Sequence, residues 1–369
     1  MTRLQRYSEY MQWAKLHSKA RFTLATSGVG AFPLRELNVS IDQLEINGDN
    51  SYGFAPLQHA IATKHGVDPA CVVEAAGTSM ANHLALAALI DPGDEVLIES
   101  PTYELVVSTA QYLQANIVRF PRREENGFAV EPQEIRKAIT PKTKLIFLTN
   151  LHNPSSVLTR DDILREVGDI ASSVGARVVV DEVYLDAVYD NTPRSSFHLG
   201  KNFVVTSSLT KVYGLSGLRC GWILAQPDLA RAIYELNDLF AATPVHPTEI
   251  LSIIALQNLD TIRDRARKIV QADRTDLKHF LDTNASHVAA VRSPYGTTSF
   301  PKLLHGDVAE LLERLRTAFE TTVVPGKFFE MPDHFRIGMG VNHAMFAEGL
   351  RRLSQALAND LNRNDRNSI

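Results

Sequence analysis

The segment SSLTKVYGLSGLRCGW, residues 207–222, carries a lysine and, eight residues later, an arginine among glycines and serines. The apolar run NFVVTSSL leads into it and the run CGWILA follows it. Near-continuous apolar runs are typical of strands that are buried on both faces. We therefore expect Lys211 and Arg219 to lie in a short connection at the end of a buried sheet, and the rest of the sequence must explain their role there.

Runs of the same kind recur upstream, and helical spacing separates them. The stretch MANHLALAALI, for example, follows the first run with the periodicity of a helix. Alternating strands and helices favour an α/β domain with a mostly parallel sheet sandwiched by helices. The upstream runs are CVVEAAG (71–77), DEVLIES (94–100), KLIFLTN (144–150) and ARVVVDEVY (176–184).

The C-terminal part has a different pattern. Helical periodicity covers about 226–285, and short strands then alternate with two helices up to the last one, MFAEGLRRLSQALAND. This α+β pattern predicts a smaller second domain. We expect a large domain over 38–255 and a small domain formed by 1–37 together with 256–369.

Composition limits the classes of partner. The chain has 369 residues, of which 44% are hydrophobic, and a net charge of -4, so it can form a large core and is a poor match for nucleic acid. Its two cysteines provide neither a disulfide framework nor a metal motif. We found no apolar run of the roughly 18 residues needed to span a membrane, and the N-terminus is too polar for a signal peptide. We therefore expect a cytoplasmic protein with no membrane, nucleic-acid or metal partner.

Polar residues follow nearly every predicted strand. Ligands of open α/β sheets bind at the carboxyl ends of the strands, so these side chains should meet at one edge. One such residue alone is usually a helix cap, but several at one edge predict a site. The residues are Thr78 and Ser79, Tyr103, Asn153, Asp181 and Tyr184, and Ser208 and Lys211.

The chemistry of this set points to a particular kind of ligand. Hydroxyls and N–H groups at the helix start after Gly77, together with Ser208 and Arg219, suit a phosphate, although no GxxxxGK[ST] motif is present. Asp181, in the apolar run VVVDEVY, needs a cationic partner if it is buried. Burial would lower the pKa of Lys211 and make its amine nucleophilic. These are the parts that a pyridoxal-phosphate site needs.

The order and spacing of six motifs resemble the fold-type I pyridoxal-phosphate enzymes, specifically the aspartate aminotransferase-like class I/II aminotransferases. The resemblance covers most of the chain. One motif departs from the family pattern, because Ser156 stands where N-P-[ST]-G has its glycine. The motifs are Ser208-x-x-Lys211 with Arg219, Asn153–Pro154, Asp181-x-x-Tyr184, Tyr103 after Pro101, Tyr52–Gly53, and Arg336 in FRIGMG.

The resemblance implies a role for each residue. Lys211 would form the Schiff base with pyridoxal 5'-phosphate and move the proton, while Asp181 would pair with the ring nitrogen. Cis peptide bonds are expected at Ser100–Pro101 and Asn153–Pro154. The remaining implied roles are ring contacts for Asn153, Tyr184, Tyr103 and Val183, phosphate contacts for Thr78, Ser79, Ser208 and Arg219, a phosphate contact in the neighbouring subunit for Tyr52, and substrate contacts for Arg336, Asn153 and the flexible segment at Gly28.

These roles predict a homodimeric aminotransferase that acts on an amino acid and a 2-oxo acid. A lyase that eliminates a carbon–sulfur group, a cyclase or an oxidase would use the same apparatus and stays an alternative. A pyridoxal-phosphate-sensing regulator would carry an additional N-terminal DNA-binding domain, which we do not expect here. A structural protein without cofactor would lack the yellow colour of the bound cofactor.

Overall fold

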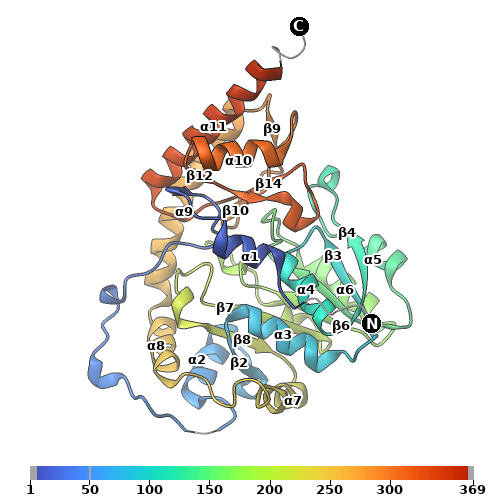
Figure 1. Ribbon diagram of the computed structural model, residues 1–369. Coiled ribbons are helices and arrows are strands. Elements are labelled where there is room, and N and C mark those ends of the chain that lie inside the picture. The colour runs from blue at the N-terminus through green and yellow to red at the C-terminus, as the bar shows by residue number, and fades with distance from the viewer. Residues whose placement is uncertain (1–5, 50, 365–369) are drawn as a thin grey trace.

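The computed structural model describes residues 6–49 and 51–364, with side chains up to residue 358. Its centre is a seven-stranded sheet in the order β2-β8-β7-β6-β5-β3-β4 (Figure 1). All strands run in the same direction except β8, which is antiparallel to both of its neighbours. This confirms the expected mostly parallel sheet and adds β4 at its edge. The strands are β2 Val72–Ala76, β3 Glu95–Ser100, β4 Asn116–Pro121, β5 Thr143–Thr149, β6 Arg177–Asp181, β7 Phe203–Ser208 and β8 Cys220–Leu224.

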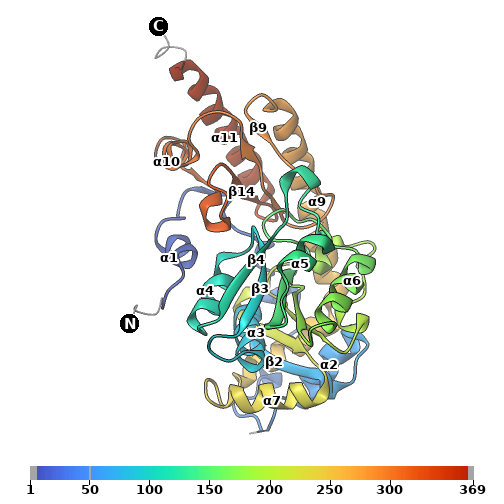
Figure 2. The same ribbon diagram turned by 90° about the vertical axis from the view of Figure 1, so that its right-hand side faces the viewer.

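Helices cover both faces of this sheet, as Figure 2 shows for α3 and α4 on one side and α5 and α6 on the other. Along β5, Leu145 and Phe147 pack into one core while Ile146 and Leu148 pack into the other. The strand runs are therefore apolar without interruption because both faces are buried. The helices are α2 Ala55–His65, α3 Gly77–Leu89, α4 Glu104–Tyr112, α5 Pro132–Ala138, α6 Asp161–Ser172, α7 Pro227–Asn237 and α8 His246–Gln257.

The reversed strand β8 determines where the opening segment of the sequence lies. Cys220, the first residue of β8, pairs with Ala76 at the end of β2, and Gly221 pairs with Ser208 at the end of β7. The connection from β7 to β8 therefore begins and ends at the carboxyl edge of the sheet. Lys211 and Arg219 both lie in this connection.

The C-terminal part of the chain forms a second packed region above the sheet in Figure 1. The predicted helical stretch 226–285 is three helices rather than one, because breaks follow α7 and α8. The elements of the second region are α9 Leu259–Thr283, β9 Val288–Ala289, β10 Thr298–Ser299, β11 Lys302–Leu303, α10 Val308–Ala318, β12 Thr321–Thr322, β13 Val324–Pro325, β14 Phe335–Gly338 and α11 His343–Asn364.

Helix α9 belongs to both cores. Ile262 and Val270, toward its start, pack with the large sheet, and Leu277 and Leu281, near its end, pack with the second region. The boundary expected between residues 255 and 256 is not marked by a break in packing here, and the division into domains stays a prediction. Among the described helices, none is long and apolar enough to cross a membrane.

The N-terminal segment lies at the junction of the two regions. Helix α1 (Glu9–Leu16) begins after Ser8, whose hydroxyl accepts a hydrogen bond from the backbone of Met11. Tyr10 is the buried residue of this helix and packs against Phe328 and Phe329. Strand β1 (Phe22–Thr23) then pairs with β12, so the following residues are held close to the sheet edge.

Candidate active site

A cavity of about 360 Å³ opens at the carboxyl edge of the large sheet. It collects side chains from the ends of four strands, from the start of α3 and from α1. Most of the residues predicted from the sequence line it. They are Thr78, Ser79, Tyr103, Asn153, Asp181, Val183, Tyr184, Lys211 and Arg219.

Lys211 presents a buried amine to this cavity. Its Nζ donates a hydrogen bond to the hydroxyl of Ser27 at 3.0 Å. Burial lowers the pKa of the Lys211 amine, and the positive charges of Arg336 and Arg219 act in the same direction, whereas Tyr10 and Asp181 oppose the shift. A larger fraction of the amine is therefore neutral near pH 7 than for an exposed lysine, as the sequence predicted.

Asp181 is a buried carboxylate whose recorded hydrogen-bond donors are neutral. One oxygen accepts from Asn82 Nδ2 at 2.8 Å and the other from the backbone N–H of Val183 at 3.0 Å. Burial raises the pKa of Asp181 to about 6, although Asn82, Val183 and the charge of Lys211 oppose the shift. The group is thus ionised at neutral pH and lies in a wall that favours a cationic partner.

Another part of the cavity wall gathers hydrogen-bond donors. Helix α3 begins at Gly77, and Thr78 Oγ1 donates to Ser208 Oγ at 2.8 Å. A Cβ at position 77 would lie 2.2 Å from Arg219 Nη2, so glycine is needed for the guanidinium to lie against the start of the helix. Thr210 adds a buried hydroxyl without a recorded partner. A helix start, a guanidinium and an unsatisfied hydroxyl together suit a phosphate.

Arg336 lies behind the cavity wall rather than in it. Its Nη1 donates to Asn153 Oδ1 at 2.9 Å and its Nη2 to the Tyr10 hydroxyl at 3.0 Å. The side chain is fully buried, and its Nε has no recorded partner. Because Asn153 and Tyr10 do line the cavity, the guanidinium is one side chain away from any bound molecule.

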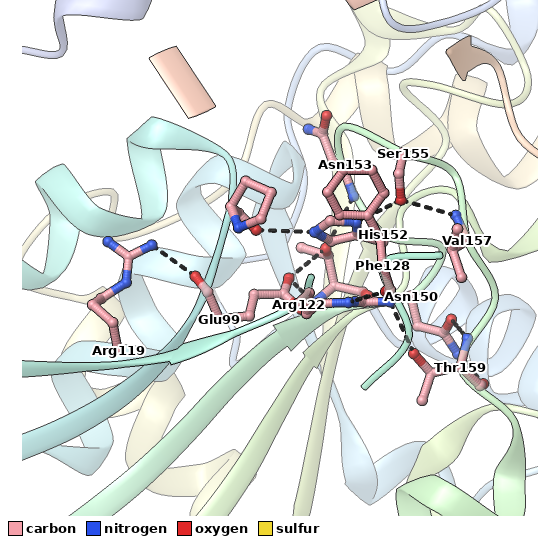
Figure 3. Close-up of polar contacts among 12 residues, drawn as sticks. Glu99, Arg119, Arg122, Phe128, Asn150, His152, Asn153, Ser155, Val157 and Thr159 are labelled. Atoms are coloured by element: carbon pink, nitrogen blue, oxygen red, sulfur yellow. Dashed lines mark hydrogen bonds and ion pairs between the residues drawn. The ribbon is translucent and has the colours of Figure 1, made fainter. Parts of the chain in front are cut away.

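The loop that carries Asn153 is held by a buried charge network (Figure 3). Arg122 Nη1 pairs with Glu99 Oε2 at 2.8 Å, and both side chains are completely buried. The other oxygen of Glu99 accepts from the backbone and the hydroxyl of Thr149, at 2.7 Å each. Thr149 Oγ1 in turn accepts from the backbone N–H of Asn153 at 3.1 Å. The ion pair therefore fixes the end of β5 and the start of the loop.

His152 ties this loop to the next one (Figure 3). Its Nε2 lies 2.9 Å from the carbonyl of Pro101, and its Nδ1 lies 2.6 Å from the hydroxyl of Ser155. Burial, together with the charge of Arg122, holds the pKa of His152 well below its usual value, so the ring is neutral. A carbonyl only accepts, so Nε2 carries the proton and Nδ1 accepts from Ser155. The neutral ring thus connects the Asn153 loop to the loop of Tyr103.

The local backbone agrees with one of the two expected cis bonds. Ser100–Pro101 is cis, but Asn153–Pro154 is not, and a second cis bond among the described residues is Asn150–Leu151. Ser156 instead adopts a left-handed conformation, with φ of 61°, at the position where the resembling motif has glycine. Its hydroxyl donates to the carbonyl of Thr298 at 2.9 Å, which holds the turn without a glycine.

Besides Arg336, three predicted residues lie outside the cavity wall. Ser208 is behind Thr78, to which it is hydrogen-bonded. Gly28 packs on Lys211, because a Cβ there would lie 2.9 Å from the Lys211 carbonyl oxygen. Tyr52 is exposed, and its hydroxyl donates to Asp238 at 3.2 Å. The structure therefore does not bring Tyr52 to the cavity of its own chain, and its role in a partner's site stays a prediction.

Sequence reasoning missed seven cavity residues, which are Tyr10, Met11, Ala14, Ser27, Asn82, Thr149 and Thr210. Asn82 follows Thr78 by four residues on α3, so helical spacing alone places both on one face. Thr210 immediately precedes Lys211. Tyr10 and Ser27 had no such signal, because only the packing of the N-terminal segment brings them to the sheet edge.

Comparisons with known proteins agree with this geometry. The family model of the class I and II aminotransferases matches residues 41–353. The chain is 29% identical to a capreomycidine synthase from Streptomyces vinaceus over 92% of this chain and 90% of that protein. It is 26% identical to a probable aspartate/prephenate aminotransferase from Aquifex aeolicus, covering 83% and 82%. A PLP-dependent aminotransferase from Streptococcus suis superposes with a TM-score of 0.90 at 26% identity, covering 97% and 98%.

The family determines the cofactor and the reaction class. Its members use pyridoxal 5'-phosphate, and the cavity fits that group. Hydrogen-bond donors suited to a phosphate lie near the start of α3, Asp181 is a carboxylate without a cationic partner among its recorded hydrogen bonds, and Lys211 has a buried amine. The family match and the named relatives make the chain a pyridoxal-phosphate-dependent transferase of amino groups. With most of its length matched and its fold shared, the chain belongs to the class I and II aminotransferases.

Proposed function

We propose that this enzyme moves an amino group between an amino acid and a 2-oxo acid, with Lys211 as its reacting amine. The observation that carries the proposal is the convergence in one cavity of the Lys211 amine, the Asp181 carboxylate and the Arg219 guanidinium. When bound, pyridoxal phosphate supplies the electron sink that eases loss of the substrate's α-proton. Thr78, Ser79, Ser208, Thr210 and Arg219 would hold its phosphate. Asp181 would hold its protonated ring nitrogen.

The remaining roles follow from the protonation states of the side chains. Lys211 Nζ, whose pKa is lowered by burial, can take up and return a proton near neutral pH. Burial raises the pKa of Tyr184 to about 12, so its hydroxyl keeps its proton and can donate a hydrogen bond to the ring oxygen, where Asn153 would join it. Tyr103 and Val183 would contact the two faces of the ring.

Arg336 would bind the α-carboxylate of the substrate. Its recorded hydrogen-bond partners are the amide oxygen of Asn153 and the hydroxyl of Tyr10, so a substrate would bring the first carboxylate to this buried guanidinium among its described contacts. A carboxylate accepts two N–H groups from arginine in parallel, which lysine cannot reproduce. Gly28, packed against Lys211, would contribute a substrate contact from the N-terminal segment.

A partner subunit would complete the site. Exposed apolar side chains occur in the two segments that meet at Tyr52, with Ile41 and Ile46 in the segment before it and Phe240 and Val245 in the segment after Asp238. The bond from Tyr52 to Asp238 and the ring contact of Phe54 with His246 hold the two segments together. We propose that this surface forms a homodimer in which Tyr52 contacts the partner's cofactor phosphate, and that the enzyme works in the cytoplasm.

The test of the reaction uses the purified holoenzyme and a panel of amino acids. We expect the cofactor's absorption band to shift and a 2-oxo acid to appear. Lys211→Ala should remain folded and retain cofactor but lose turnover by at least about a thousand-fold, because it removes both the amine and its proton transfer. Exposed Lys201→Ala is the matched control. Turnover by Lys211→Ala at the rate of the parent enzyme would refute the proposal.

A cyclase is the second candidate, because a solved structure of the same fold, with a TM-score of 0.87 at 23% identity, is titled a PLP-dependent cyclase. The panel separates the two reactions: transamination releases a 2-oxo acid, whereas cyclisation leaves the substrate nitrogen in the product.

The dimer is tested by mixing the Lys211→Ala variant with the Tyr52→Ala variant. Restored activity in the mixture supports a site shared between subunits. If both variants are inactive alone and the mixture is inactive too, the result contradicts a shared site.

A further inference from the structure

Ser27 occupies a fixed place against Lys211. It is buried, and its carbonyl oxygen accepts from Thr297 Oγ1 at 2.8 Å, which anchors it to the second region. Two residues further on, the backbone N–H of Val29 donates to the Lys211 carbonyl at 2.8 Å. The segment from 27 to 29 is thus held directly on the lysine that lines the cavity.

The Ser27 hydroxyl contacts two functional groups at once. It accepts from Lys211 Nζ at 3.0 Å and also hydrogen-bonds with the Tyr184 hydroxyl. One small side chain therefore links the amine to the phenol. No motif in the sequence marks Ser27, and the function proposed above assigns it no role.

Ser27 also lies where two cavities meet. Beside the cavity described above, a second one of about 350 Å³ lies between α1 and the segment that follows β1. Ser27 and Lys211 line both cavities. The hydroxyl–amine pair therefore lies in the wall that the two cavities share. The other residues shared by the two linings are Tyr10, Ala14 and Thr210.

We propose that Ser27 is a positioning residue for Lys211: its hydroxyl holds the free amine in one orientation and connects it to Tyr184. This inference rests on the proposed role of Lys211. A lysine side chain has four rotatable bonds, so its amine can occupy many positions. A hydrogen bond that fixes the amine reduces the number of unproductive conformations. The effect should therefore appear in turnover rather than in substrate binding.

Several charges set the protonation of this amine. Burial, Arg336 and Arg219 lower the pKa of Lys211, and Tyr10 and Asp181 raise it. Ser27 acts beside them as a neutral acceptor. A hydrogen bond donated by the ammonium favours the charged form, so loss of the hydroxyl should lower the pKa further.

The first experiment is steady-state kinetics of the holoenzyme. We expect Ser27→Ala to lower kcat about ten-fold, the size expected for one hydrogen bond to a charged group, with KM nearly unchanged. Ser27→Thr keeps the hydroxyl and should restore most of kcat. The matched control is Ser18→Ala, whose hydroxyl lies in the second cavity but is bonded to the Ala14 carbonyl.

The second experiment measures the amine itself in the full-length protein stripped of cofactor. The pH dependence of Lys211 acetylation by acetic anhydride, followed by mass spectrometry, gives its pKa. We expect a value lower by about one unit in Ser27→Ala than in the parent and in Ser27→Thr. If Ser27→Ala does not fold, Ser27→Cys keeps the size of the side chain with a weaker acceptor and replaces it.

Three results would overturn the inference. They are an unchanged kcat and pKa in Ser27→Ala, an equal loss in Ser18→Ala, and a Ser27→Thr variant as impaired as Ser27→Ala, since each means that the hydroxyl does not position the amine. Active Lys211→Ala would instead refute the proposed function itself, so the two failures can be told apart.

Discussion

Two arginines of this protein, Arg122 and Arg336, are fully buried, yet their surroundings differ. Arg122 forms an ion pair with Glu99 at 2.8 Å, behind the cavity wall. The recorded hydrogen-bond partners of Arg336 in the described part of the chain are the amide oxygen of Asn153 and the hydroxyl of Tyr10, and neither is a carboxylate. Burying an unpaired charge is costly, so the paired arginine is explained by the architecture while the other calls for an anion from outside.

The same contrast holds for the carboxylates. Glu99 has its counter-ion within the protein, whereas Asp181 receives hydrogen bonds from Asn82 and a backbone N–H. Glu99 and Arg122 thus neutralise each other in the network of Figure 3, whereas Asp181 faces the cavity and Arg336 lies one side chain behind its wall. This contrast separates the charged groups that support the site, Glu99 and Arg122, from those that we expect to interact with a ligand, Asp181 and Arg336.

The largest effect should come from breaking the internal pair. Arg122→Met leaves Glu99 buried without a counter-ion, and we expect it to lower the free energy of unfolding by about 3–5 kcal/mol in urea denaturation. The double variant Glu99→Gln with Arg122→Met removes both charges and keeps an acceptor for Thr149. It should recover most of that loss. A single variant as stable as the parent would contradict the contrast.

Asp181 should show the opposite behaviour. Its pKa is about 6 in the folded protein against 3.8 for the free group, so its contribution to stability is present below pH 3.8 and is lost as the pH rises through 6. The difference corresponds to about 3 kcal/mol at high pH.

Asp181→Asn removes this titration. We therefore expect the cofactor-free variant to be more stable than the parent at pH 8, by up to about 3 kcal/mol, with the advantage shrinking toward pH 4. Urea denaturation at both pH values measures this. Parallel pH profiles for variant and parent would show that Asp181 is not destabilised by its surroundings. The gain in stability should be accompanied by weaker cofactor retention.

The smallest effect concerns Arg336. Arg336→Lys keeps the positive charge but loses the guanidinium group that can donate two parallel hydrogen bonds to a carboxylate. We therefore expect KM for the amino acid to rise about 10–100-fold, with little change in the free energy of unfolding. Steady-state kinetics and urea denaturation of the same preparation test both halves of the statement. A variant that unfolds easily but binds substrate normally would assign Arg336 to the architecture instead.

The sequence predicted the sheet and most of the cavity wall for a physical reason. Asp181, Asn153 and Lys211 follow buried strands, and parallel strands bring such positions to one edge whatever their loops do. Tyr10 and Ser27 could not be found in this way, since their positions depend on how the N-terminal segment packs against the sheet edge. That segment lies more than 180 residues before Lys211 in the chain. Glu99 and Arg122 were also missed, because their pairing depends on the register of β3 and β4.

The reversed direction of β8 has a consequence for how this gene can vary. The connection between β7 and β8 starts and finishes at the same sheet edge, with Ser208 and Gly221 paired across its base. Its eleven positions between the two strands, 209–219, therefore form a closed span that places Lys211 and Arg219 at one cavity. An insertion in this span would move one of the two side chains away from the cavity, so we expect this span to reject insertions that surface loops elsewhere in the chain accept.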